Sequence, residues 1–263
     1  MKNYRWLVFT LLALATMEST AQQMPMPSAV YEWDMVPVEK TPNGIERAFF
    51  NWPTQSFDNF RISAITLASN SVRQMVHHGI AEEGLLLVKE GRLGLASDSK
   101  ENVVGSRSIV LVPRMASLEI FNAGDGALTF YSIQWRTAPG ASDSVFHGLK
   151  IFDYEKLSFN KNEKGGRRAI MRAPTALLEE LEMHITTLNE GEKSHDPHQH
   201  PDEEIIIVLQ GKVAEMVNGT AYALRTGSVI FLKSMDFHGI RNIGSGQCEY
   251  YAIRWKKTPG HSP

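Results

Sequence analysis

Short apolar runs separated by Gly, Asn, Asp and Pro follow one another along the chain from about Ile45. Each run lasts only a few residues before a turn residue interrupts it. This spacing is typical of short β-strands, and a succession of such strands indicates a sandwich or barrel. The pattern therefore predicts an all-β protein.

The two halves of the chain repeat one another. The first half ends in FYSIQWRTAPG (Phe130 to Gly140), and the second half ends in YYAIRWKKTPG (Tyr250 to Gly260), 120 residues later. The same offset pairs Asn122 with Asn242 without a gap. Repetition at a fixed offset indicates that one structural unit has been duplicated.

The repeat and the composition together divide the chain into five parts. We expect a signal peptide at 1–21, an N-terminal arm at 22–43, a first barrel at 44–140, a linker at 141–164 and a second barrel at 165–260. The arm is rich in Met, Pro and Gln and has no clear period, so it either lies over the body or stays mobile.

Two segments at the start of the second half have more than one interpretation. The basic stretch with GGRR at Gly165 to Arg168 has the composition of a phosphate or carboxylate cradle, but no strand and helix frame it, so a charged linker is favoured. The following ALLEELEMHITTL opens like a helix. We expect strand from Leu181 to Leu188, because the corresponding FDNFRISAITL is typical of strand.

The first residues have the pattern of an export signal. Lys2 and Arg5 precede an apolar run from Trp6 to Ala15, and Ser19 to Ala21 supplies the small residues that a signal peptidase accepts. A membrane anchor is the alternative, but this run is too short to span a bilayer. We expect cleavage after Ala21 and a periplasmic or secreted protein with no membrane contact afterwards.

Charge and cysteine content exclude several classes of partner. The 263 residues carry a formal net charge of −2, which indicates neither nucleic acid nor an anionic membrane surface as a partner. The single cysteine, Cys248, cannot form an internal disulfide and is expected to be a buried apolar residue. The fold then depends on its core. The sequence leaves homo-oligomerisation open.

Four candidate metal ligands lie in two segments of the second half. His198, His200 and Glu204 are separated by two and four positions, so on an extended strand their side chains share one face. His238 lies in a second strand-like run, GSVIFLKSMDFHGIRN, that a sheet can bring alongside. Three imidazoles and one carboxylate suit one divalent transition metal and leave one or two positions open. The ligands do not distinguish Mn, Fe, Ni and Zn.

These segments resemble the two motifs of the cupins, HxHxxxE followed by six residues and Gly, and GxxxxxPxGxxHxxxN. The positions that match are His198, His200, Glu204, Gly211, Gly227, His238 and Asn242. Lys233 replaces the usual Pro and Met235 the usual Gly, which weakens the turn before His238. A solvated His-rich turn beside Pro197 is the alternative for the first motif. The resemblance implies two tandem double-stranded β-helix (jelly-roll) barrels, as in bicupins.

The first half has lost most of this motif. The offset places Ile80, Gly84 and Leu118 at the positions of the last three ligands and retains only His78. We expect the first barrel to hold no metal, to be apolar or filled inside, and to provide a partner surface for the second barrel.

Two shorter features have structural interpretations. Glu82 and Glu83 are expected to be solvated residues beside a strand. Asn218 and Gly219 separate AEMV from TAYAL, which predicts a two-residue hairpin in preference to a used glycosylation triplet with Thr220.

Candidate substrate contacts lie on the last strand. Residues at alternate positions from Tyr251 to Trp255 recur in both halves, so that face is expected to serve the shared architecture. Tyr250 and Arg254 lie on the other face and differ from the first half. If that face lines the metal cavity, they orient an anionic or hydroxylated substrate; otherwise Arg254 lies on the outer surface. Glu182 and His184 share one face of the opening strand and have the same two interpretations.

Three function classes fit the sequence. The first is a metal-dependent enzyme of the isomerase, decarboxylase or hydrolase type acting on a small polar or anionic metabolite. The second is an oxygenase that resembles the quercetin dioxygenases in its three-His, one-Glu ligand set. The third is a non-catalytic barrel that binds a small ligand. The first class ranks highest. Motifs of this kind identify a metal cage better than they identify a reaction.

Overall fold

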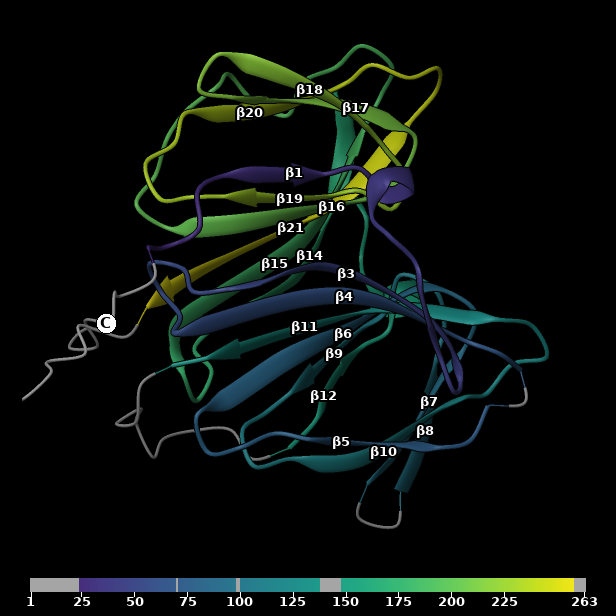
Figure 1. Cartoon of the computed structure of the whole chain (residues 1–263). Helices are drawn as coiled ribbons and strands as arrows, with labels where there is room; N and C mark the ends of the chain where they lie inside the picture. Colours follow the sequence, from purple (N-terminus) through teal and green to yellow (C-terminus); the bar gives the residue numbers. More distant parts are fainter. Residues whose placement is uncertain (1–23, 70, 98–99, 138–147, 258–263) are drawn as a thin grey trace, which may run out of the picture.

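A computed structural model describes residues 24–69, 71–97, 100–137 and 148–257 of the chain. These residues are mostly strand and form two jelly-roll barrels, each made of a large and a small antiparallel sheet (Figure 1). The expected all-β fold is confirmed. The expected signal peptide, residues 1–21, lies outside the described residues.

The first barrel comes mainly from the first half of the chain. Its large sheet runs in the order β12 (Lys150–Phe152), β9 (Ile109–Val112), β6 (Glu82–Glu90), β11 (Leu128–Arg136), β4 (Asn59–Leu67), β3 (Gly44–Trp52) and β2 (Glu39–Thr41). Its small sheet runs in the order β5 (Gln74–His77), β10 (Ser117–Asn122), β7 (Leu93–Ser97) and β8 (Lys100–Val104).

The second barrel repeats this plan. Its large sheet runs in the order β1 (Ala29–Tyr31), β19 (Val229–Leu232), β16 (Glu203–Gln210), β21 (Cys248–Lys257), β15 (Leu178–Leu188), β14 (Gly165–Ala173) and β13 (Asn160–Asn162). Its small sheet runs in the order β18 (Thr220–Arg225), β17 (Lys212–Val217) and β20 (His238–Asn242). The segment from Leu181 to Leu188 is strand, as expected, and belongs to β15. Cys248 is buried, also as expected.

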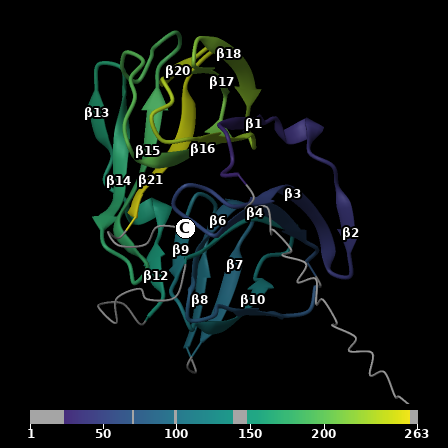
Figure 2. The same ribbon diagram turned by 60° about the vertical axis from the view of Figure 1, so that its left-hand side comes forward.

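Each barrel takes its outermost strand from the segment that precedes the other barrel. Strand β1 precedes the first barrel in the sequence but pairs with β19 of the second, and β12 precedes the second barrel but pairs with β9 of the first (Figures 1 and 2). A short 3-10 helix follows each of them, η1 (Trp33–Met35) and η2 (Tyr154–Lys156). The described part of the arm therefore lies on the body of the protein and matches the segment between the barrels.

The two large sheets pack against each other through aromatic and aliphatic side chains. Tyr251, Ile253 and Trp255 on β21, with their counterparts on β11, lie in one buried cluster that draws on both barrels. The ring of Phe57 stacks against Trp255 with 5.2 Å between centroids. Removing this apolar surface from water favours association of the sheets. The recurring face thus serves the shared architecture, as the repeat predicts.

Buried carboxylates join the barrels in a reciprocal way. Glu203 accepts hydrogen bonds from the Thr54 hydroxyl at 2.8 Å and the Gln55 backbone N–H at 2.9 Å. Its counterpart Glu83 accepts from the Thr175 hydroxyl at 2.5 Å. The expectation that Glu83 is solvated is wrong, because the start of β6 faces the other barrel and supplies donors there.

The interior of the first barrel is filled. Leu118 and Phe130 are buried in its apolar cluster. A Cβ atom on Gly84 would lie 2.5 Å from the backbone oxygen of Ile133, so this position has no space for a carboxylate side chain. Ile80 is exposed on the turn before β6. The positions that correspond to three of the ligands therefore hold none of the groups that a metal needs.

Two short features complete the description. Asn218 and Gly219 have φ values of 49° and 86°, and Val217 pairs with Thr220, so the predicted two-residue hairpin is confirmed. Within the described residues, no helix has the length and apolar character that a membrane span needs.

Candidate metal centre

The candidate ligands lie where the segment before β16 meets β20. His198 and His200 precede β16, Glu204 lies on β16, and His238 begins β20. His198 and His238 form an isolated antiparallel bridge in which each backbone N–H donates to the other residue's oxygen, at 2.9 and 2.8 Å. A directly opposed pair places both side chains on one side of the sheet.

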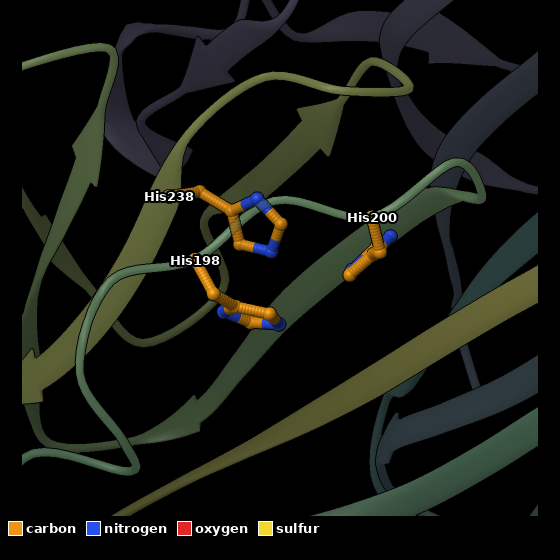
Figure 3. A group of neighbouring side chains, drawn as sticks. All are labelled: His198, His200 and His238. Carbon is orange, nitrogen blue, oxygen red and sulfur yellow. The ribbon is translucent and has the colours of Figure 1, made fainter.

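The three imidazoles converge on one space. Figure 3 shows the rings of His198, His200 and His238 turned toward one another, and their ligand atoms all lie within 4.8 Å. The Glu204 Oε2 atom lies 3.1 Å from Nε2 of His200 and 3.7 Å from Nε2 of His238. The sequence-predicted set is therefore brought together. Among the described residues, the group of three His, Cys, Asp or Glu ligands with this spacing lies in the second barrel.

Backbone carbonyls fix which nitrogen of two rings is free to bind. Nδ1 of His200 lies 2.9 Å from the Asp202 oxygen, and Nδ1 of His238 lies 2.8 Å from the Asp236 oxygen. A carbonyl only accepts hydrogen bonds, so Nδ1 carries the proton and the neutral ring has a lone pair on Nε2. Both lone pairs then face the Glu204 carboxylate, an arrangement that a cation between them stabilises. The donor set fits a divalent metal.

The local electrostatics favour the ligand forms of Glu204 and His198, whereas the pKa of His238 is raised, because the Glu204 carboxylate outweighs the lowering by burial. Burial alone would raise the pKa of Glu204, but the neighbouring imidazoles of His200 and His238 outweigh it and hold the pKa at about 2. Burial and the neighbouring imidazoles lower the pKa of His198. A carboxylate and a neutral imidazole are the forms that coordinate metals.

The turn before β20 has the conformation that the glycine of the motif would provide. Met235 has a φ of 66°, in the left-handed region, and its backbone N–H donates to the His200 oxygen at 2.8 Å. The corresponding Met115 has a φ of 58°. The replacement of glycine therefore strains the turn without removing it.

The replacement of proline by Lys233 has a structural role. The Lys233 backbone N–H donates to the Ser28 hydroxyl oxygen at 2.8 Å, and that hydroxyl donates to Asp236 at 2.6 Å. Proline has no N–H and could not make the first bond. The N-terminal arm thus binds the turn that leads to His238.

The four candidate ligands line a cavity of about 370 Å³. Tyr250 and Arg254 also line it, so the face that carries them is the cavity face and the outer-surface alternative for Arg254 is wrong. Arg254 contacts Glu182 at 2.6 Å, and Glu182 and His184 belong to the same wall. The role of these side chains toward a substrate stays a prediction.

Arg167 is a cavity residue that the sequence reading missed. The GGRR segment begins β14, so the charged-linker interpretation is wrong there. Its first arginine, Arg167, lines the cavity. Arg167 Nη2 lies 2.9 Å from both the Glu182 carboxylate and Nδ1 of His184. Burial and the Arg167 charge lower the pKa of His184 to about 4, so this imidazole is neutral at pH 7. Only the pairing of β14 with β15 reveals the contact.

Glu215 is the second residue missed. It lies on β17 with 1% of its surface exposed, it lines the cavity, and its counterpart in the first barrel is Leu95. Burial raises the pKa of Glu215 to about 8. The strand reading of AEMV gave no sign that this carboxyl points inward.

Comparison with known proteins identifies the second barrel. A family model described as "Cupin domain" matches residues 184–254, a span that contains all four candidate ligands. A comparison with the sequences of curated proteins found no match.

Solved structures of similar fold cover both barrels. Protein Ylba from E. coli has a TM-score of 0.68 at 15% identity over 90% of this chain and 94% of that chain. Oxalate decarboxylase of Lactobacillus farciminis, in a formate complex, has 0.66 at 13% over 92% and 89%. A variant of oxalate decarboxylase from Bacillus subtilis has 0.64 at 12% over 90% and 79%. At these identities the likeness concerns the fold.

Proposed function

Because the chain belongs to the cupin superfamily, we propose that its second barrel binds one divalent transition metal and uses it in a reaction on a small anionic metabolite. The observation that carries the proposal is the orientation of His200 and His238, whose Nε2 lone pairs face the Glu204 carboxylate. With His198 they offer three neutral donors and one charge, a set that suits Mn, Fe, Ni or Zn.

The metal, when bound, would polarise a carbonyl or carboxylate oxygen of the substrate or stabilise an enolate. The chain supplies the binding groups around it. Arg254 and Arg167 lie in the cavity wall, and each forms an ion pair with Glu182. Their guanidinium donors suit a carboxylate. Tyr250 is buried in the same wall and presents a phenolic hydroxyl. These groups would orient an anionic substrate toward the metal ligands.

The reaction we favour is an isomerisation, decarboxylation or hydrolysis. Two of the proteins with a similar fold are oxalate decarboxylases, one of them with formate bound, which makes a small carboxylate a reasonable first substrate class here. The cavity volume of about 370 Å³ lies at the small end of ligand sites and favours a compact metabolite.

A dioxygenase of the quercetinase type is the second candidate. Its support is the combination of three imidazoles and one carboxylate, which leaves positions for oxygen and substrate. The two arginines in the wall count against an uncharged aromatic substrate, since an apolar ring would leave them without new partners. A non-catalytic ligand-binding barrel is the third candidate, and it needs no turnover.

These candidates are tested by measuring turnover by the metal-loaded protein of a panel of keto acids, sugar acids, ureides and flavonoids, under air and under nitrogen. The proposal predicts turnover of an acid under both atmospheres and none with His200→Ala. Turnover of a flavonoid that requires air supports the dioxygenase instead. A ligand that raises the melting temperature while no compound is converted contradicts the enzyme proposal and supports the binding barrel.

We also propose that the protein is exported, on the evidence of the basic start, apolar run and Ser19 to Ala21 site. Mass spectrometry of protein recovered from the periplasm or medium should give a chain that begins at Gln22. A chain that retains Met1 and stays inside the cell contradicts export.

A further inference from the structure

Glu215 is a buried carboxyl group whose side chain has a hydrogen bond to the backbone of Gly239. It lies on β17 between Val213 and Val217, which are buried on the same face of the strand. Among the described residues its Oε2 atom has no hydrogen-bond partner, an unfavourable state for a buried polar atom. The first barrel has Leu95 at this position, fully buried, so the barrel folds with an apolar side chain there.

The strand register places Glu215 beside the metal ligands. Val217 pairs with His238 and Glu215 pairs with Ile240 across β17 and β20. Side chains two residues apart on a strand share a face, and a diagonal pair across two strands is separated by about 7–8 Å between Cα atoms. Both Glu215 and His238 line the cavity. One small metabolite therefore spans the space between them.

The surroundings favour the neutral form of this carboxyl. The ionisable groups that face it are His238 on β20, Glu204 on β16 and Tyr250 on β21, with Tyr222 opposite on β18. Among the described residues, the groups that shift the pKa of this carboxyl include no lysine or arginine. While no metal is bound, burial without a cationic side chain keeps this carboxylic acid protonated near neutral pH.

We propose that Glu215 transfers a proton to the substrate during the metal-dependent reaction, an inference that rests on the proposed function. The Glu215 O–H bond breaks, its proton bonds to the substrate atom that carries the new electron pair, and the O–H electrons stay on the carboxylate. After the product leaves, the carboxylate takes a proton from water. A buried carboxylic acid that lines the substrate cavity suits this work.

Two variants separate this role from a structural one. Glu215→Gln keeps the shape but cannot supply the proton, and Glu215→Leu reproduces the residue of the first barrel and serves if the glutamine variant folds poorly. We expect one metal per chain, an unchanged KM and a kcat reduced about 100-fold or more for the acid that the wild type converts.

Each other outcome has a defined meaning. Wild-type kcat in both variants overturns the role of Glu215 and leaves the proposed function standing. Loss of metal in Glu215→Gln assigns the residue to the metal site and also overturns it. A wild type that converts no compound overturns the proposed function and this inference together. Infrared spectroscopy of the metal-loaded wild type at pH 7 should further show a protonated carboxylic acid band that both variants lack; its absence from the wild type overturns the inference irrespective of turnover.

Discussion

His198 and His238 exchange both of their backbone hydrogen bonds across an isolated bridge, at 2.9 and 2.8 Å. The position of these two imidazoles is therefore set by main-chain pairing and does not require a metal. The side chains of His200, just before β16, and of Glu204, on β16, complete the cage.

Removing one imidazole should thus remove the metal and keep the fold. We expect His200→Ala to lose at least most of its metal, because three remaining donors bind it less tightly, while the far-ultraviolet circular dichroism stays that of the wild type. His77→Ala is the matched control, since that ring is exposed and lies on β5 of the first barrel. Equal metal content in both variants would remove His200 from the site.

Relief of strain at Met235 should stabilise the protein. The left-handed φ of 66° costs a residue with a side chain about 1 kcal/mol or more, and Met235 is exposed, so Met235→Gly should raise the free energy of unfolding by about 1 kcal/mol. Met235→Ala retains the strain and should give no gain. Denaturant unfolding measures both, and equal effects of the two variants would show that the backbone strain is not the cause.

The reciprocal carboxylates should contribute strongly to the contact between the barrels. Glu203→Ala leaves the buried Thr54 hydroxyl and the partly buried Gln55 N–H without this acceptor, so we expect a loss of about 2–4 kcal/mol. The control Glu46→Ala removes an ion pair to the exposed Arg61 and should change the free energy of unfolding by less than about 1 kcal/mol. Similar losses in the two variants would contradict the account of the interface.

Glu83 should make stability depend on pH. Burial raises its pKa above the ordinary value of 4.5, although hydrogen bonds from Thr175 and the following backbone oppose the shift. Between 4.5 and the folded pKa the folded state holds a proton that the unfolded state has lost, so the free energy of unfolding falls as the pH rises through this window. Glu83→Gln cannot titrate and should show a shallower decline over the same range. An identical pH profile in variant and wild type would exclude this titration.

The sequence predicted the architecture and the ligands because both depend on spacing. The offset between Trp135 and Trp255 identifies the duplication, and the intervals from His198 to Glu204 predict three candidate ligands on one face. The strands β1 and β12, by contrast, pair with sheets distant in the sequence, and no local period records which sheet a short strand joins.

The buried carboxyl groups could not be read in the same way. Glu203 and Glu204 are adjacent, yet one accepts bonds from the other barrel and its neighbour faces the metal cavity. Successive residues of a strand point to opposite faces, but only the packing decides which faces are buried. Glu215 was missed for the same reason, since a charged residue in a short strand ordinarily indicates exposure.

The central claim is that the second barrel holds one metal and the first holds none. Elemental analysis of protein purified without chelators tests it most directly, with His238→Ala as the paired sample. We predict a stoichiometry near one divalent transition metal per chain for the wild type and near zero for the variant. Two metals per chain, or one metal retained in full by His238→Ala, would contradict the claim.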